Sequence, residues 1–127
     1  MKQVTIRPAV VVGMHHYGRR ELSVGATYKI ELEPFNKYDS NAVAVFDGFR
    51  KCGNLKRESS AAISEVMRLN LAKSKYVLKP LEESVVKSRK IGPQQLSEVI
   101  FKVDDGADVD PIKNIGKKYS YVSVTIL

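Results

Sequence analysis

Two neighbouring segments with the periodicity of β-strands restrict the fold of this chain more than any other feature. In residues 26–34, "ATYKIELEP", apolar and charged residues alternate, as in a strand that buries one of its faces. Residues 42–55, "AVAVFDGFRKCGNL", follow closely and are interpreted as a β-hairpin whose turn is Asp47-Gly48. The sequence therefore predicts a fold built on short antiparallel strands.

The rest of the chain is expected to add further strands and one clear helix. The apolar run in residues 3–12 is interpreted as a first strand, in which Pro8 interrupts the pairing or lies at an edge. After the hairpin, the apolar period becomes that of an amphipathic helix, roughly residues 55–72, with Asn54 or Ser59 as its N-cap. The later segments are strands at 75–81, 97–103 and 118–127, a loop at 104–117, and a stretch at 82–96 that the pattern does not assign.

These elements amount to roughly five to seven short strands, which indicates a mainly β (α+β) fold. Such a set closes best as a small β-barrel or a strongly bent sheet, with one or two helices packed at its end. The length of 127 residues suits a single domain. Small barrels of this kind bind oligonucleotides with aromatic and basic residues on a strand face.

The charge of the chain favours a polyanionic partner. The formal net charge is +7 at pH 7, and the basic residues gather in residues 50–57 and again in residues 73–90. The acidic residues gather instead in residues 104–110. A basic face attracts nucleic acid, an acidic protein or an anionic surface. The plainer alternative, a soluble basic protein without such a partner, stays open at this point.

Little in the sequence points to catalysis. The chain contains no phosphate-binding loop of the GxxxxGK[ST] type, no GxSxG nucleophile elbow and no HExxH zinc motif. We therefore expect a non-enzymatic protein without a cofactor. The acidic residues could bind a divalent cation, but they lack the order of a calcium loop and are interpreted as a solvated loop: Asp104, Asp105, Asp108 and Asp110.

Two further features were considered as sites. His15 and His16 invite a metal reading, but neighbouring residues on a strand point to opposite faces, so we expect no metal there. Cys52 is the only cysteine, so it is interpreted as a structural thiol, although nearby basic residues leave a reactive one as the alternative. No apolar stretch is long enough to span a bilayer or to serve as a signal peptide, and we expect a cytoplasmic protein.

Three short stretches together supply the parts of a single-strand binding site. "HHYGRR" places His15, His16 and Tyr17 beside two arginines, and "NKYDSN" surrounds Tyr38 with polar groups. "GNLKRES" opens the expected helix with basic residues, and helix N-termini attract phosphates. Stacking rings, cations for phosphates and short polar groups for sugar hydroxyls are what an unpaired strand requires.

The order of these stretches resembles the HIRAN domain, a module found at the N-terminus of helicase-like proteins and in stand-alone bacterial and phage proteins. The resemblance is carried by "VVVGMHHYG", then "ELEPFNKYDSNAVAV", then "GNLKRESSAAIS". It covers about residues 9–72 well, whereas residues 73–127 match only in outline. The chain is accordingly interpreted as one HIRAN-like domain over residues 1–127 that diverges from about residue 73.

The resemblance implies an OB-like or SH3-like β-barrel that binds single-stranded DNA and prefers a free 3′ end. It implies that Asp39 accepts a hydrogen bond from the terminal 3′-hydroxyl, that Tyr38 stacks on or flanks the last bases, and that Asn36 shapes the pocket. His15 and His16 stand where the family has residues that contact phosphate and base. The resemblance implies phosphate contacts near the start of the helix from Asn54 and Arg57, and Lys56 is added because it is a basic residue near the positive end of that helix.

The sequence departs from the family pattern at two places, and three of its residues have a purely structural alternative. Glu33 replaces the usual aspartate before Pro34, and the histidine pair replaces an Arg-Tyr pair. Base stacking from that strand is therefore expected to be weaker, or Tyr17 takes it over. Aspartate often caps its own turn. The plainer readings are turn-capping by Asp39, core packing by Tyr38 and a structural turn role for Asn41.

Two functions of different classes follow. The leading hypothesis is a non-catalytic module for single-stranded nucleic acid, DNA being favoured, that recognises free 3′ ends in repair, replication or a mobile element. The alternative is an interaction or inhibitor protein that docks on a DNA-processing enzyme, as small phage-type proteins can. The feature that favours the alternative is the basic cluster in residues 73–90, where the resemblance fades.

Overall fold

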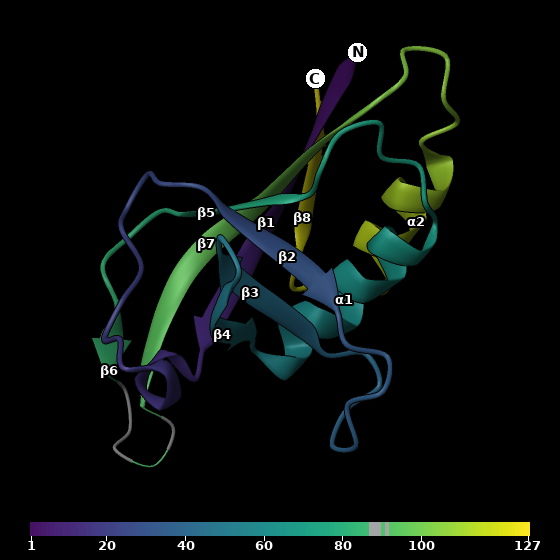
Figure 1. The fold of residues 1–127 in the computed structure, drawn as a ribbon. Coiled ribbons are helices and arrows are strands. Elements are labelled where there is room, and N and C mark those ends of the chain that lie inside the picture. The colour runs from purple at the N-terminus through teal and green to yellow at the C-terminus, as the bar shows by residue number, and fades with distance from the viewer. Residues whose placement is uncertain (87–89, 91) are drawn as a thin grey trace.

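The computed structural model describes residues 1–86, 90 and 92–127, and it contains a sheet of eight antiparallel strands with two α-helices (Figure 1). The strands are β1 (Lys2–Val12), β2 (Tyr28–Leu32), β3 (Val43–Asp47), β4 (Arg50–Leu55), β5 (Val77–Pro80), β6 (Val85–Val86), β7 (Pro93–Val103) and β8 (Ser123–Ile126). The helices are a short 3₁₀ helix, η1 (Met14–Tyr17), and the α-helices α1 (Arg57–Arg68) and α2 (Asp110–Lys118).

Six of the strands close into a barrel, as the sequence predicts. The order β7-β5-β2-β3-β4-β1 returns to its start because β1 also pairs with β7. The long strand β1 pairs with β8 through Val4–Arg7 and with β4 through Val11 and Val12, so its two halves have different neighbours on one edge. The mainly β fold with helices packed against it is therefore confirmed.

Pro8 disturbs the ladder of β1 as expected. The register between β1 and β7 shifts between Ile6 and Ala9, on either side of this proline. Proline has no backbone N–H to donate to a ladder, so it is tolerated where a bulge interrupts the pairing. The predicted first strand is correct in extent to within a residue.

The core lies inside the barrel and beneath the helices. The alternation in β2 buries Tyr28 and Ile30, and Val45 on β3 faces Ile30 across the ladder. Cys52 on β4 is 1% exposed and its Sγ donates to the carbonyl of Val45. Burial raises the pKa of the Cys52 thiol, and its Sγ is enclosed, so the thiol is structural rather than reactive.

The hairpin of β3 and β4 is present, but its turn lies one residue later than predicted. Asp47 is the last residue of β3 and pairs with Arg50, so the turn residues are Gly48 and Phe49. Gly48 has a φ of 61°, which a glycine adopts without steric cost at this position of a two-residue turn. The glycine determines where the chain reverses, and the aspartate remains in the ladder.

Helix α1 is shorter than the predicted 55–72, and neither proposed N-cap serves as one. Lys56 occupies the N-cap position without a side-chain bond. Asn54 belongs to β4, and Ser59 lies in the first turn, where its Oγ accepts a hydrogen bond from the Val10 N–H. The apolar stripe is correct: Ala62, Ile63 and Val66 are buried. The start of α1 is thus attached to β1 rather than capped by its own side chains.

The predicted loop at 104–117 is wrong in its second half, which forms α2. Ile112 and Ile115 are buried one turn apart, and Asp110 and Pro111 occupy the first turn, where an acid and a proline suit a helix. The last strand is correspondingly shorter, since β8 begins only at Ser123. Figure 1 shows α1 and α2 side by side on one flank of the barrel, and Lys118 joins them by a bond to Glu65.

The unassigned stretch 82–96 contributes β6 and the first part of β7. Residues 87–89 and 91 lie outside the described residues, so Lys87 and Arg89 of the second basic group are not placed. Within the described ranges, no helix is long and apolar enough to cross a membrane.

Candidate nucleic-acid interface

The loop between β2 and β3, residues 33–42, is organised by the side chain of Asn36. Its Oδ1 accepts hydrogen bonds from the backbone N–H of Tyr38 at 2.9 Å and of Asp39 at 3.2 Å. The Asn36 N–H donates to the Glu33 carbonyl at 3.0 Å. An asparagine that bonds the backbone two residues ahead fixes a turn without help from a ladder. The shape of this loop is therefore encoded locally.

Asp39 has one oxygen inside the loop and the other toward helix α1. Its Oδ1 accepts the Asn41 N–H at 2.9 Å, so the turn-capping reading is correct for that oxygen. Its Oδ2 lies 4.0 Å from Arg57 Nε, and the Asp39 side chain is 23% exposed. That separation is too long for a hydrogen bond. Oδ2 and the exposed guanidinium thus form a loose ion pair without a hydrogen bond between them.

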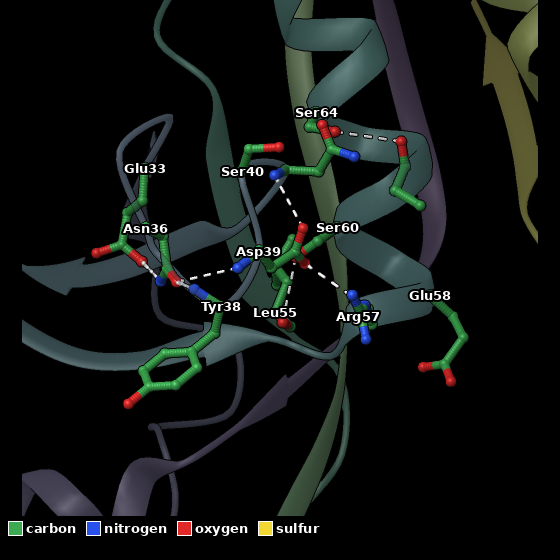
Figure 2. Close-up of polar contacts among 12 residues, drawn as sticks. Glu33, Asn36, Tyr38, Asp39, Ser40, Leu55, Arg57, Glu58, Ser60 and Ser64 are labelled. Atoms are coloured by element: carbon green, nitrogen blue, oxygen red, sulfur yellow. Dashed lines mark hydrogen bonds and ion pairs between the residues drawn. The ribbon is translucent and has the colours of Figure 1, made fainter.

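The ring of Tyr38 extends into solvent, away from this ion pair. It is 82% exposed, which excludes the alternative that Tyr38 packs in the core. Figure 2 shows the ring directed away from Asp39 and Arg57, while the backbone of Tyr38 is held by Asn36. Lys37 Nζ lies 5.5 Å from the centre of the ring. An exposed aromatic face on a fixed backbone is well suited to stack on an unpaired base.

Glu33 connects this loop to the neighbouring strand β4. Its carboxylate accepts hydrogen bonds from Lys51 Nζ and from Asn54 Nδ2, each at 2.9 Å. Burial acts to raise the pKa of Glu33, but the bonds from Lys51 and Asn54 outweigh it, and the pKa lies below its ordinary value. Asn54, expected at the helix start, instead lies beneath the loop and helps to hold Glu33.

The histidine pair lies in η1 and not on a strand, so the expectation that the two side chains point to opposite faces is wrong. Gly13 ends β1 with a φ of 73°, and the chain then winds into a 3₁₀ turn anchored by buried Met14. The rings of His15 and His16 lie side by side, with their centres 4.0 Å apart. Both side chains are exposed, and the pair forms an aromatic surface at this end of the barrel.

Tyr17 and Lys51 connect η1 to the loop. Lys51 Nζ lies 5.7 Å from the centre of the Tyr17 ring and 2.9 Å from Glu33 Oε2. Burial acts to lower the pKa of Lys51, but its bonds to Glu33 and Tyr17 outweigh it, and the net shift is upward. The structure therefore joins the two predicted halves of the site through Lys51, a residue that the sequence pattern did not single out.

The start of α1 supplies the cations. Lys56 and Arg57 occupy the N-cap and first positions of the helix, where the dipole is positive. The Arg57 side chain is 80% exposed. The nine predicted residues come from four places: Asn36, Tyr38 and Asp39 from the loop, Lys56 and Arg57 from the start of α1, Asn54 from β4, and His15, His16 and Tyr17 from η1. Asn54 bonds Glu33 of the loop, and Tyr17 approaches Lys51.

The family model of the HIRAN domain matches residues 9–103. The chain belongs to the HIRAN domain family. The HIRAN family is known for DNA binding, and the domain is not itself catalytic. The resemblance seen in the sequence over about residues 9–72 is thereby confirmed, and the match extends through β7. No curated protein is significantly similar to the chain in sequence.

Solved structures support the same fold at low sequence identity. The crystal structure of the HIRAN domain of human HLTF is 18% identical with a TM-score of 0.65, covering 93% of this chain and 90% of that one. The NMR structure of the HLTF HIRAN domain is 20% identical with a TM-score of 0.60, covering 90% and 87%. A Lactobacillus plantarum protein is 18% identical with a TM-score of 0.56, covering 80% of this chain and all of that one.

In this HIRAN domain, one more residue holds loop 33–42 in place, and the sequence did not indicate it. Arg68, at the end of α1, donates to Asn41 Oδ1 at 2.6 Å and to the Ser40 carbonyl at 2.9 Å. These bonds support the structural reading of Asn41. No spacing in the sequence indicates the contact, because it joins the far end of the helix to the loop only after both have packed.

The acidic residues of this HIRAN domain have cationic or backbone partners. Asp104 lies 3.5 Å from Lys73 Nζ, Asp105 lies 3.2 Å from the N-terminal amino group, and Asp108 accepts the Asp110 N–H at 3.0 Å. Among the residues that the structure describes, no group of three metal-ligating side chains comes together. Nothing in this geometry connects the acidic stretch to the site at loop 33–42.

Proposed function

We propose that this protein is a non-catalytic module that binds the free 3′ end of single-stranded DNA at loop 33–42 and the start of α1. The observation that carries the proposal is the loose ion pair of Asp39 Oδ2 with Arg57 Nε, 4.0 Å apart, next in sequence to Tyr38, whose ring is exposed. Membership of a DNA-binding family and the net charge of +7 support the choice of ligand.

The carboxylate of Asp39 indicates which part of a DNA strand the site would bind. A carboxylate repels the phosphates of the backbone, so it fits where the strand presents a hydrogen-bond donor, such as a sugar hydroxyl or a base amino group. A terminal hydroxyl is such a donor, and Asp39 Oδ2 is the oxygen turned toward Arg57 and not used by the Asn41 N–H. Arg57 then neutralises the adjoining phosphate, and Tyr38 stacks on a terminal base. The preference for the 3′ over the 5′ terminus rests on the family resemblance.

The whole chain is proposed to act as one domain. β8 pairs with β1, and α2 is joined to α1 through Lys118 and Glu65. These contacts attach the segment after residue 103 to the barrel that the family match covers. We accordingly treat residues 1–127 as the binding unit in the experiments below.

Fluorescence anisotropy with short labelled oligonucleotides tests the proposal. We expect tight binding to a 3′-hydroxyl strand, weaker binding to the same strand with a 3′-phosphate, and an affinity that falls steeply with salt. Asp39→Asn keeps an oxygen for the Asn41 N–H but removes the charge, and it is expected to reduce the preference for the hydroxyl by about tenfold. Asp108→Asn, which alters an equivalent turn bond elsewhere, is the matched control.

The outcomes separate the parts of the proposal. Equal affinity for 3′-hydroxyl, 3′-phosphate and duplex ends would refute end recognition and leave strand binding intact. Absence of binding at low salt would refute DNA binding as a whole. A loss of preference in Asp108→Asn equal to that in Asp39→Asn would show that net charge, and not the Asp39 carboxylate beside Arg57, is responsible.

One observation favours the second candidate, docking on a DNA-processing enzyme. Phe49, at the tip of the β3–β4 hairpin, is fully exposed and has no core role. Aromatic side chains of this kind often anchor protein interfaces. A pull-down from nuclease-treated lysate, repeated with Phe49→Ser, tests it: a partner captured by the wild type and lost in the variant supports docking, and no captured partner contradicts it.

A further inference from the structure

A row of side chains crosses the outer face of four neighbouring strands, beginning at the site described above. In register, Lys51 on β4 is opposite Phe46 on β3, Phe46 is opposite Lys29 on β2, and Lys29 is opposite Val77 on β5. Directly opposed residues of antiparallel strands project to the same face. With strands about 4.8 Å apart, the row covers roughly 15 Å.

A groove lies along the far part of this row. It has a volume of about 250 Å³ and is lined by Thr27, Tyr28, Lys29, Phe46, Gly48, Lys75, Tyr76 and Val77. The charged side chains among these lining residues are two lysines, and none is a carboxylate. Phe46 and Tyr76 are half-buried, so each presents only part of its ring. The chemistry of the lining is thus cationic and aromatic.

The two lysines of the groove are available to an anion. Lys75 is exposed. Lys29 pairs with Glu31 at 2.7 Å, but both side chains are about half exposed, at 49% and 46%. An ion pair with that exposure is weak and screened by salt, so a phosphate can compete for the ammonium group. Lys75 belongs to the second basic group of the sequence, which the end-binding site does not use.

The near end of the row meets the end-binding site directly. Lys51 Nζ bonds Glu33 at 2.9 Å and lies 5.7 Å from the ring of Tyr17. Glu33 belongs to the loop that carries Asp39, so Lys51 links this loop to the row, in which Phe46 and Lys29 follow Lys51 in register. Helix η1 packs against β4 at the Lys51 end of the row, while Lys29 is 49% exposed.

We propose that this groove binds the part of the single strand that lies 5′ of the bound terminus. Lys29 and Lys75 contact phosphates, while Phe46 and Tyr76 contact the faces or edges of unpaired bases. Grooves that combine a cationic track with aromatic side chains bind single strands with little sequence preference. The inference rests on the proposed function, since the end-binding site supplies the register from which the strand enters the groove.

The test compares a thymidine trimer with a thymidine dodecamer, both with a free 3′-hydroxyl, by competition against a labelled strand. The full chain is used as wild type, as Lys29→Gln with Lys75→Gln, and as Lys113→Gln with Lys117→Gln. The last pair removes the same charge from exposed positions on α2, away from the groove. The quantity measured is the affinity advantage of the dodecamer over the trimer.

We expect the wild type and the α2 variant to favour the dodecamer, and the groove variant to lose at least about threefold of that advantage. For the groove variant, the slope of log affinity against log salt concentration is expected to be smaller in magnitude by about 1.4, because two phosphate contacts are lost. A dodecamer carrying 5-iodo-2′-deoxyuridine five or six nucleotides from its 3′ end is expected to crosslink to the tryptic peptides that contain Phe46 or Tyr76.

Three results would contradict the proposal that the groove binds the strand. These are equal affinity of the wild type for both lengths, an equal loss in the two lysine variants, and crosslinks that avoid both peptides. If the trimer still binds in these cases, end binding stands and only the groove fails. If neither oligonucleotide binds to the wild type, the proposed function fails and the groove fails with it.

Discussion

The loops at residues 33–42 and 104–109 are both rich in polar residues, but their side chains have different surroundings. Each contains an aspartate that accepts the N–H two residues ahead, Asp39 from Asn41 and Asp108 from Asp110. In the first loop a second carboxylate oxygen faces Arg57 across 4.0 Å and an aromatic ring extends into solvent. In the second, Asp104 pairs with Lys73 at 3.5 Å, and no aromatic residue is present.

The difference teaches that a high density of polar residues does not by itself indicate a site. Such residues commonly serve only to turn the chain. What distinguishes loop 33–42 is that its backbone is fixed by Asn36, so that Tyr38 and Asp39 are presented in a defined arrangement toward a cation. The following predictions address this contrast, in order of decreasing effect.

Removing the exposed ring is expected to have the largest effect. Tyr38→Ala loses base stacking worth about 1–3 kcal/mol, which corresponds to roughly 5- to 150-fold weaker binding of a 3′-hydroxyl strand. Tyr38→Phe keeps the ring and is expected to retain most of the affinity. Anisotropy measures both. Since the Tyr38 side chain is 82% exposed, thermal stability is expected to stay unchanged in both variants. If Tyr38→Ala bound the strand as tightly as the wild type, the main reason to distinguish the two loops would be removed.

Releasing the backbone of the loop is expected to have the next largest effect. Asn36→Ala leaves the N–H groups of Tyr38 and Asp39 without their acceptor, and we expect about 1–2 kcal/mol lower stability together with weaker strand binding. Chemical denaturation measures the first and anisotropy the second. Asn114→Ala, at an exposed position of α2, is the matched control. Unaltered affinity in Asn36→Ala would mean that the arrangement of the loop does not depend on Asn36.

The acid dependence of stability is expected to involve Glu33. Its pKa is lower in the folded state than the ordinary 4.5, so its stabilising contribution is complete above that pH and is lost as the pH falls through the lowered value. Glu33→Gln removes this contribution, and we expect a flatter stability profile below about pH 4.5. Glu31→Gln, on the outer face of β2, is the control. Parallel profiles for wild type and Glu33→Gln would contradict the assignment.

Changes in the second loop are expected to have the smallest effect. Asp104→Asn removes one partner of an exposed ion pair, which typically changes stability by less than about 1 kcal/mol. Affinity for a 3′-hydroxyl strand is expected to be unchanged or slightly higher, because a negative charge is lost from a distant part of the surface. A marked loss of strand binding in this variant would show that the two loops are not different in kind.

The sequence predicts the barrel because its signals are local. The alternation in β2, the apolar run of β3 and the stripe of Ala62, Ile63 and Val66 each fix one face of one element. Helix α2 escapes prediction because its apolar residues are only Ile112 and Ile115, while Pro111 and Gly116 are typical of loops. The 3₁₀ turn of the histidines is too short to produce any period.

The sequence predicts only those residues of the site that lie in one continuous segment. Asn36, Tyr38 and Asp39 lie within four residues, and a family motif identifies them. The partners that complete the arrangement, Lys51 on Glu33 and Arg68 on Asn41, come from other elements. Their contacts depend on strand register and on the direction of α1, which no local pattern specifies.

The double pairing of β1 has a consequence for how the molecule opens. Val4, Thr5 and Ile6 pair with both β7 and β8, and Val11 pairs with both β7 and β4, so β1 has paired neighbours along most of its length. Its amide hydrogens are therefore expected to exchange with deuterium only when the whole barrel unfolds. Those of Tyr38 and Asp39, held by a single side chain, exchange through local opening, and a bound strand end is expected to slow them selectively.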